Sequence, residues 1–309
     1  MARPTRPAPP PLRRLLIGTD FSPGASAALT RAPHLPLAPR AAITLLHVLP
    51  AWMNRAIHTR EFTLAARRLR REATRLLRAL RSAGSKEVRV STVLAQGNPN
   101  EEILRRSAAA DLVIVGRHGR RSFPDLLVGS TAERVVQRAL VPTLLVARRA
   151  RTPYRRPLAA VDLSEASRPA LDAAARVLGP AGRSLDVVHA YHPEHEQLLQ
   201  RVATRAARAA YERECRSEAR RAVSSLLGAS AAAPMSGALL LRRTDPRPAI
   251  LSTARARGAD LIAVGTHGRA GLAHWLLGSV AEAVMRHASC DVLVAPPQRT
   301  SRRSGRRAA

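Results

Sequence analysis

The chain has 309 residues, a formal net charge of +29 at pH 7, 46% hydrophobic residues and only 3% aromatic ones. This length suits two domains of ordinary size, whose cores must be built from aliphatic side chains. The charge is nearly all arginine, which favours anionic partners such as nucleic acid, nucleotides or anionic lipid; biased base composition in the gene explains it equally well. Two cysteines, Cys215 and Cys290, exclude a disulfide framework and a CxxC metal site.

Short apolar runs alternate with longer segments rich in Ala, Leu and Arg along the first half of the chain. The runs are residues 15–22, 44–50, 111–116 and 142–147. Such alternation predicts a βαβα order with a parallel sheet that is buried on both faces.

The segment 61–81 predicts an amphipathic helix, because its apolar and basic side chains separate at helical spacing. One face holds Leu69, Ala73, Leu76, Leu77 and Leu80, and the opposite face holds Arg67, Arg71, Arg75 and Arg78. The basic face is most simply a solvated surface.

The second half of the chain repeats the first. Asp20 corresponds to Asp162, 142 residues later, and Gly116 corresponds to Gly265, 149 residues later. The second copy therefore holds about seven extra residues between these points. A period of this length is too long for a solenoid and indicates a tandem duplication of a whole domain.

We expect two domains flanked by basic tails. The predicted units are a tail at 1–11, a first domain at 12–150, a second domain at 151–297 and a tail at 298–309, with a linker near 148–157 and a long helix near 195–227 ending at Gly228. The first tail lacks the apolar stretch of a secretory signal, and the uncharged residues 222–241 are broken by glycine and proline. A soluble, cytoplasmic protein is therefore expected.

One glycine spacing, G-x2-G-x9-G-S, occurs twice, each time directly after an apolar run. The two occurrences are Gly116, Gly119, Gly129 and Ser130, and Gly265, Gly268, Gly278 and Ser279. Glycine lets a ligand approach the backbone, and the helix that follows the third glycine offers free N–H groups to an anion. The motif is neither the P-loop nor the dinucleotide fingerprint. It predicts a phosphate site at the carboxyl edge of the sheet, with Ser130 as a helix cap. The alternative is that the glycines serve only turns and close packing.

These motifs, together with Asp20 and Asp162 at the first strand ends, resemble the universal stress protein family over residues 12–150 and 156–297. The length is similar to that of the tandem members. The resemblance implies an α/β fold of two tandem, doubly wound, open parallel five-stranded sheets of the adenine nucleotide α-hydrolase-like kind. It also implies that the strands PTLLVA and DVLVA join the two domains as a pseudo-twofold pair.

The same resemblance implies ATP as the ligand, with Mg²⁺ as a companion of the triphosphate. Adenine would lie near Asp20 and the backbone of Val48 in the first copy, and near Asp162 and the backbone of Ala190 in the second. The triphosphate would follow the glycine motif.

Several residues near these positions have two explanations. Arg120 and Arg269 either add charge to the phosphates or are exposed loop residues. For His118 and His267, local hydrogen bonding is favoured over phosphate contact. His47 and His189 either line the pocket or have a structural role, and the sequence does not decide between these alternatives. Cys290 is expected to be a small core residue, and helix-dipole stabilisation suffices to explain Glu133 and Glu282.

Two departures distinguish the copies. Thr244 stands where the first copy has Gly97 after the third strand, which predicts a different pocket wall in the second copy. Pro33, Pro36 and Pro39 interrupt the region of the first helix, where the second copy is uninterrupted.

The chain contains no nucleophile–base arrangement and no zinc-ligand spacing. The sequence therefore predicts an ATP-binding, non-catalytic regulatory protein of the stress response, with an unknown protein partner and no membrane span. One alternative is a slow ATPase or nucleotide transferase. Another is a nonspecific nucleic-acid-associated protein that uses Arg-rich helices and tails, although aromatic stacking residues are nearly absent.

Overall fold

The computed structural model describes residues 10–51, 55–119, 128–164, 166–180, 184–191, 204–266 and 277–297. The first copy runs β1 (Leu12–Gly18), α1 (Pro23–Arg31), the 3-10 helix η1 (Ala32–His34), β2 (Leu37–Leu49), α2 (Arg55–Ser82), β3 (Arg89–Gln96), α3 (Pro99–Ser107), β4 (Leu112–Gly116), α4 (Ser130–Arg138) and β5 (Thr143–Val146). The second runs β6 (Pro157–Val161), α5 (Ser167–Leu178), β7 (Leu185–Ala190), α7 (Arg205–Gly228), η2 (Ala233–Met235), β8 (Ser236–Arg242), α8 (Pro246–Arg257), β9 (Leu261–Gly265), α9 (Ser279–His287) and β10 (Asp291–Ala295).

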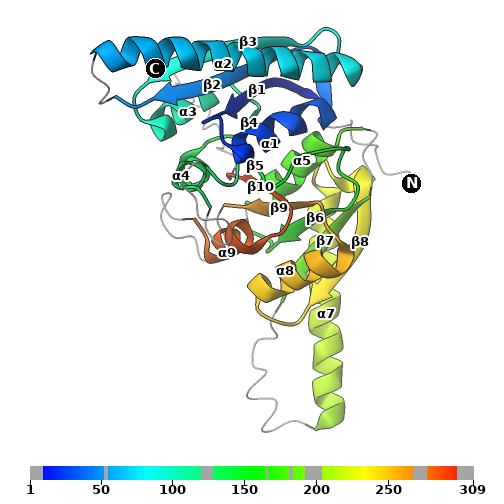
Figure 1. Ribbon diagram of the computed structural model, residues 1–309. Helices are drawn as coiled ribbons and strands as arrows, with labels where there is room; N and C mark the ends of the chain where they lie inside the picture. Colours follow the sequence, from blue (N-terminus) through cyan, green and yellow to red (C-terminus); the bar gives the residue numbers. More distant parts are fainter. Residues whose placement is uncertain are drawn as a thin grey trace, which may run out of the picture.

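The two predicted five-stranded units join into one ten-stranded sheet, in the order β3-β2-β1-β4-β5-β10-β9-β6-β7-β8 (Figure 1). Every strand pair within a copy is parallel. Each copy starts in a middle strand, so its winding reverses between β1 and β4, or between β6 and β9. In open sheets of this kind, ligands bind at the carboxyl ends of the strands beside that reversal.

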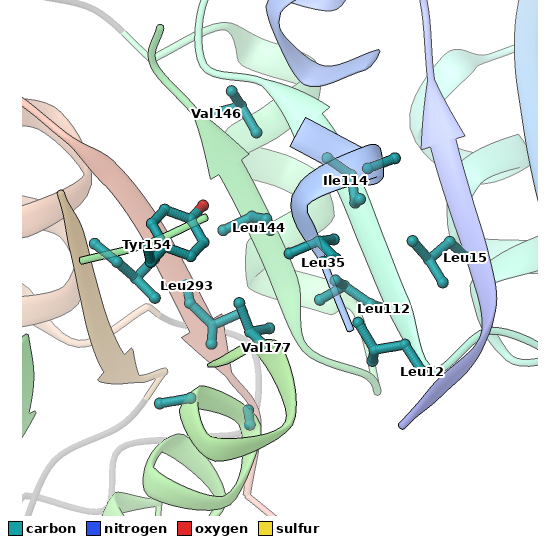
Figure 2. Close-up of a cluster of buried hydrophobic side chains, with 14 of the residues drawn as sticks. Leu12, Leu15, Leu35, Leu112, Ile114, Leu144, Val146, Tyr154, Val177 and Leu293 are labelled. Carbon is teal, nitrogen blue, oxygen red and sulfur yellow. The ribbon is translucent and has the colours of Figure 1, made fainter. Parts of the chain in front are cut away.

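The copies meet through β5 and β10, which pair antiparallel with Leu144 opposite Leu293. These two leucines are equivalent positions, 149 residues apart, so the pseudo-twofold axis passes between them. The predicted pairing of the fifth strands is therefore confirmed. Figure 2 shows the buried cluster continuing from Leu12 and Leu112 of the first copy through Leu144 to Leu293 of the second.

The core has one layer on each face of the sheet. Alternate residues of a strand point to opposite faces, so Leu15 and Leu16 of β1 belong to different clusters. One cluster packs under α1, α2, α5 and α7, and the other packs under α3, α4, α8 and α9. Both clusters continue across the join between the copies.

Helix α2 confirms the amphipathic pattern at 61–81 and extends it to Arg55–Ser82. Its leucines at 69, 76 and 80 are buried, whereas the four arginines of the predicted basic face are exposed. Helix α7 ends at Gly228, as predicted. Among the described residues, no helix is long and apolar enough to cross a membrane.

Pro33 and Pro39 alter the region around the first helix of the first copy. Helix α1 has nine residues and passes into η1, which contains Pro33, whereas α5 has twelve residues without a break. Pro39 lies in β2 beside Arg40, whose φ of +58° accompanies a register shift against β1. A bulge of this kind accommodates a proline within a strand.

Candidate functional site

An aspartate follows the central strand of each copy and precedes a strained residue. Phe21 after Asp20 and Leu163 after Asp162 have φ values of +63° and +65°. Bulky side chains rarely adopt this left-handed region, which costs on the order of 1–3 kcal/mol. In each turn, the backbone N–H two residues after the aspartate donates to its carboxylate at 3.0 Å. The same strained turn thus orients both carboxylates at the carboxyl edge.

The glycine motif of the first copy reaches this aspartate. A Cβ atom built on Gly119 would lie 3.2 Å from Oδ2 of Asp20. The sequence placed these two residues in separate halves of one predicted site, about one hundred residues apart. The winding of the sheet brings them together, because β1 and β4 are neighbours.

The first glycine of each motif has a packing role. A Cβ on Gly116 would lie 2.4 Å from the backbone carbon of Gly24 in α1. In the second copy, a Cβ on Gly265 would lie 2.7 Å from the Cβ of Ala166. Contacts this short exclude any side chain, so close helix–strand packing accounts for these two glycines.

The third glycine of each motif begins a helix. Gly129 N–H donates to the Arg117 carbonyl at 2.9 Å, and Gly278 N–H donates to the Thr266 carbonyl at 2.8 Å. Each glycine is the N-cap residue, without a side-chain capping bond, and the following serine is exposed. The prediction that Ser130 caps the helix is therefore wrong, because the helix begins one residue earlier than expected.

Neither α4 nor α9 has a side-chain cap, a feature that they share with α5, whose N-cap residue is Ala166. Helices α1, α3, α7 and α8 are capped by Ser22, Asn98, Thr204 and Asp245. The first N–H groups of α4 and α9 have no such partner, so the positive end of each helix dipole can receive an anion.

His47 and His189 fasten the second strand of each copy to the end of the first. Nδ1 of His47 lies 2.7 Å from the Thr19 carbonyl, and Nδ1 of His189 lies 2.8 Å from the Val161 carbonyl. Because a carbonyl accepts, Nδ1 is the protonated nitrogen in both rings. Both side chains are buried, and His47 also packs on the ring of Phe21. These contacts give the two histidines a structural role.

The side of the candidate site that is formed by the ends of the second and third strands differs between the copies. Val48 pairs with Ala95, whereas its equivalent Ala190 pairs with Arg242. Gly97 after β3 has φ +138°, a conformation that non-glycine residues rarely adopt. The positive-φ non-glycine residues in the described part of the chain do not include Thr244, so the turn after β8 has a different backbone. This agrees with the predicted divergence of the second wall.

The second aspartate also has an additional local partner. Ser167 Oγ donates to Oδ1 of Asp162 at 2.7 Å. The equivalent residue in the first copy is Ala25, which has no hydroxyl group. This hydroxyl therefore binds the carboxylate of the second site within its own domain, a contact that Ala25 cannot make in the first copy.

Glu72 is a residue near the first site that the sequence analysis missed. It lies on α2, is 9% exposed, and accepts a hydrogen bond from Thr19 Oγ1 at 3.1 Å. Burial raises the pKa of Glu72, although the bond from Thr19 and the charges of Arg68 and Arg75 act in the opposite direction. The sequence did contain an indication that Glu72 is buried, because it lies three residues after Leu69 on the apolar face of the helix.

Replacing Glu72 with glutamine is expected to stabilise the protein above pH 4.5 and not below it. A carboxyl whose pKa is higher in the folded state gives stability that is lost as pH rises from the unfolded value through the folded one. Glutamine does not titrate, and its oxygen can accept the bond from Thr19. Urea unfolding at pH 4 and pH 8 measures the difference. The exposed Glu61→Gln on the same helix is the control; an equal Glu72→Gln effect at both pH values would contradict the assignment.

Some predicted site residues lie outside the described part of the chain. These are Arg120, Gly268, Arg269 and His267. Cys290 is buried, and burial raises the pKa of its thiol to about 12, as suits an unreactive core residue. Within the described residues, no three His, Cys, Asp or Glu side chains gather in a way that could hold a metal ion.

Comparison with known proteins identifies both halves of the chain. The universal stress protein family matches residues 11–147 and again residues 153–296. A universal stress protein from Coxiella burnetii is 34% identical over 146 residues, which is 45% of this chain and 94% of that protein. A universal stress protein from Methanocaldococcus jannaschii is 23% identical over 155 residues, covering 44% of this chain and 96% of that protein.

Two solved structures match nearly the whole chain. A universal stress protein from Archaeoglobus fulgidus aligns with a TM-score of 0.65 at 20% identity, covering 92% of this chain and 98% of its own. One from Pseudomonas aeruginosa aligns with a TM-score of 0.59 at 19% identity, covering 93% and 94%. At these identities the likeness concerns the fold, and it includes the tandem arrangement.

Proposed function

The chain belongs to the universal stress protein family, as a tandem member with two family domains, and we propose that it binds ATP and acts as a non-catalytic regulatory protein. The observation that carries the proposal is the approach of Gly119 to Asp20 at the reversal point of the first sheet. Only glycine leaves the space beside that carboxylate open, and an uncapped helix start lies at the end of the same motif.

The proposed roles follow from the chemistry of each group. A carboxylate at Asp20 or Asp162 can accept hydrogen bonds from ribose hydroxyls or an adenine amine. The backbone at Val48 or Ala190 would border the base. The first N–H groups of α4 and α9, with the exposed hydroxyls of Ser130 and Ser279, would donate to phosphate oxygens. Mg²⁺ would accompany the phosphates.

Isothermal titration with ATP tests this function. The wild-type chain should bind ATP saturably, and Asp20→Ala with Asp162→Ala should weaken binding roughly tenfold or more, about 1.4 kcal/mol. Each single variant should affect one site. ATP turnover should be the same in the wild type and the double variant, because the proposal has no catalytic step. Absence of ATP binding to either half would refute the proposal, and turnover well above the double variant would favour an ATPase.

A specific observation also favours a second function, binding to the phosphate backbone of nucleic acid. Helix α2 exposes a row of arginines: Arg60, Arg67, Arg70, Arg71, Arg75, Arg78 and Arg81. None of these forms an ion pair with another described residue, and Glu61 is the one exposed acid on the helix. Like charges at this spacing destabilise a helix. Most of the apolar face is buried against the sheet, although Phe62 and Leu64 near the start of the helix are exposed. The row of arginines spans about 32 Å.

Exchanging Arg67, Arg71, Arg75 and Arg78 for glutamine should reduce the salt dependence of binding to duplex DNA. Loss of four phosphate contacts lowers the slope of log K against log salt by about 3–4. The matched control changes four exposed arginines of α7, which extends away from the sheet (Figure 1), namely Arg205, Arg213, Arg216 and Arg220. If both quadruple variants show the same slope of log K against log salt, DNA binding depends on the overall positive charge and α2 is not a specific binding face.

A further inference from the structure

Arg117 follows the first glycine of the first motif, and its side chain contacts the second copy. It is 7% exposed, and its guanidinium donates to the carbonyls of Arg286 and Ala288 at the end of α9 in the second copy. The last carbonyls of a helix have no partner within the helix, and a cation there is also favoured by the helix dipole. Arg117 therefore caps a helix of the other domain.

The backbone of Arg117 is bonded to the first site. Its carbonyl accepts from Gly129 N–H at the start of α4, and its own N–H donates to Val146 of β5, both at 2.9 Å. A second contact runs in parallel, because Glu133 in the first turn of α4 pairs with Arg286 at 3.3 Å. The start of α4 and the last turn of α9 are thus held together by two interactions.

The other end of α9 belongs to the second site. Its N-cap residue, Gly278, donates to the Thr266 carbonyl in the second motif. Helix α9 has nine residues and is about 14 Å long, so it spans from the second motif to Arg117. The arrangement has no twin, because the position equivalent to Arg117 is occupied by Thr266, whose side chain is far shorter.

We propose that Arg117 couples the two nucleotide sites, so that ATP at the first motif alters α9 and the affinity of the second site. The proposal rests on the proposed ATP-binding function. Phosphates received at the start of α4 would restrain the Arg117 backbone and, through its guanidinium, the end of α9. Binding free energies are reciprocal, so ATP at the second site must affect the first by the same factor.

Hydrogen exchange in a chain with one working site tests the coupling. In Asp162→Ala, ATP at a concentration that fills the first site but not the weakened second site should slow exchange of the α9 amides, residues 280–288, by about fivefold or more. Adding Arg117→Met, which keeps the buried volume and removes the donors, should abolish this response while ATP still binds. The response should also diminish with Glu133→Gln, a partly exposed position that leaves Arg117 intact.

A second readout uses affinity. Asp20→Ala weakens ATP binding at the first site. In the native chain it should therefore change the ATP dissociation constant of the second site, and in the Arg117→Met background it should leave that constant unchanged. The control is Arg176→Gln, which removes another contact between the copies, the 3.5 Å pair with Asp111 before β4. This control should retain the α9 response.

The outcomes separate the two proposals. If ATP binds both halves but α9 does not respond, or responds equally in Arg117→Met, the coupling is refuted and the binding function stands. If the Asp162→Ala chain binds no ATP, the function proposed for the first site fails, and the coupling fails with it.

Discussion

Replacing Asp291 with alanine should lower the free energy of unfolding by about 3–5 kcal/mol. Asp291 begins β10, is 3% exposed, and joins three segments of the chain. It accepts from Arg31 at 3.0 Å, from the Tyr154 hydroxyl at 2.7 Å and from the Ala147 N–H at 2.9 Å. Without the carboxylate, the buried guanidinium of Arg31 is left with the Thr152 carbonyl and the face of Tyr154.

This cluster should also fix how the two copies sit together. The position equivalent to Asp291 is Pro142, so the cluster occurs on one side of the pseudo-twofold axis only. Urea unfolding of Asp291→Ala and Asp291→Asn measures the effect, with asparagine expected to lose less because it can still accept from Ala147. The exposed pair Arg40–Glu87 supplies the control, and Glu87→Gln should change stability by less than about 0.5 kcal/mol. Equal effects at the two positions would contradict this account.

Changing Gly119 to valine should strongly weaken nucleotide binding at the first site without unfolding the chain. The valine Cβ would lie 3.2 Å from Oδ2 of Asp20, and its two methyl groups would occupy the space beside that carboxylate. Gly119 is not among the described glycines with a positive φ, so valine is not excluded by a left-handed backbone. Titration with ATP should show the first site weakened roughly a hundredfold, about 2.7 kcal/mol, and the second site retained.

The matched control is Gly228→Val at the end of α7. No atom lies within 4 Å of a Cβ built on Gly228, so this change should leave ATP binding unaffected. If Gly119→Val binds ATP at both sites with native affinity, the first site does not lie between Gly119 and Asp20.

The repeat made most of the fold predictable. Matching Asp20 with Asp162 and Gly116 with Gly265 was enough to indicate a duplicated α/β unit, and the resemblance to the universal stress protein family implied that the last strands pair. The Asp291 cluster could not be predicted, because its partner Arg31 lies on the distant helix α1 and its partner Tyr154 lies in the irregular linker between the copies. No local pattern encodes such contacts.

The sequence indicated candidate site residues but not what each of them contacts. Spacing could not reveal that Gly116 serves helix packing while Gly119 borders Asp20, since this depends on the distance between α1 and β4. The cap expected at Ser130 was misplaced because helix starts are uncertain by a residue in sequence patterns. Glu72 and Arg117 were missed because charged residues in an arginine-rich chain appear solvated until burial is known.

Photoaffinity labelling with 8-azido-ATP, followed by peptide mapping, tests the central claim most directly. The adenine end of the proposed sites lies where the first and second strands of each copy end, so labelled peptides should contain residues 19–22 or 47–49, and 161–164 or 189–191. Unlabelled ATP should prevent this labelling saturably, and Asp20→Ala should remove it from the first copy alone. Labelling that ATP does not prevent, or that falls on α2 or α7 instead, would contradict a nucleotide site at the carboxyl edge of the sheet.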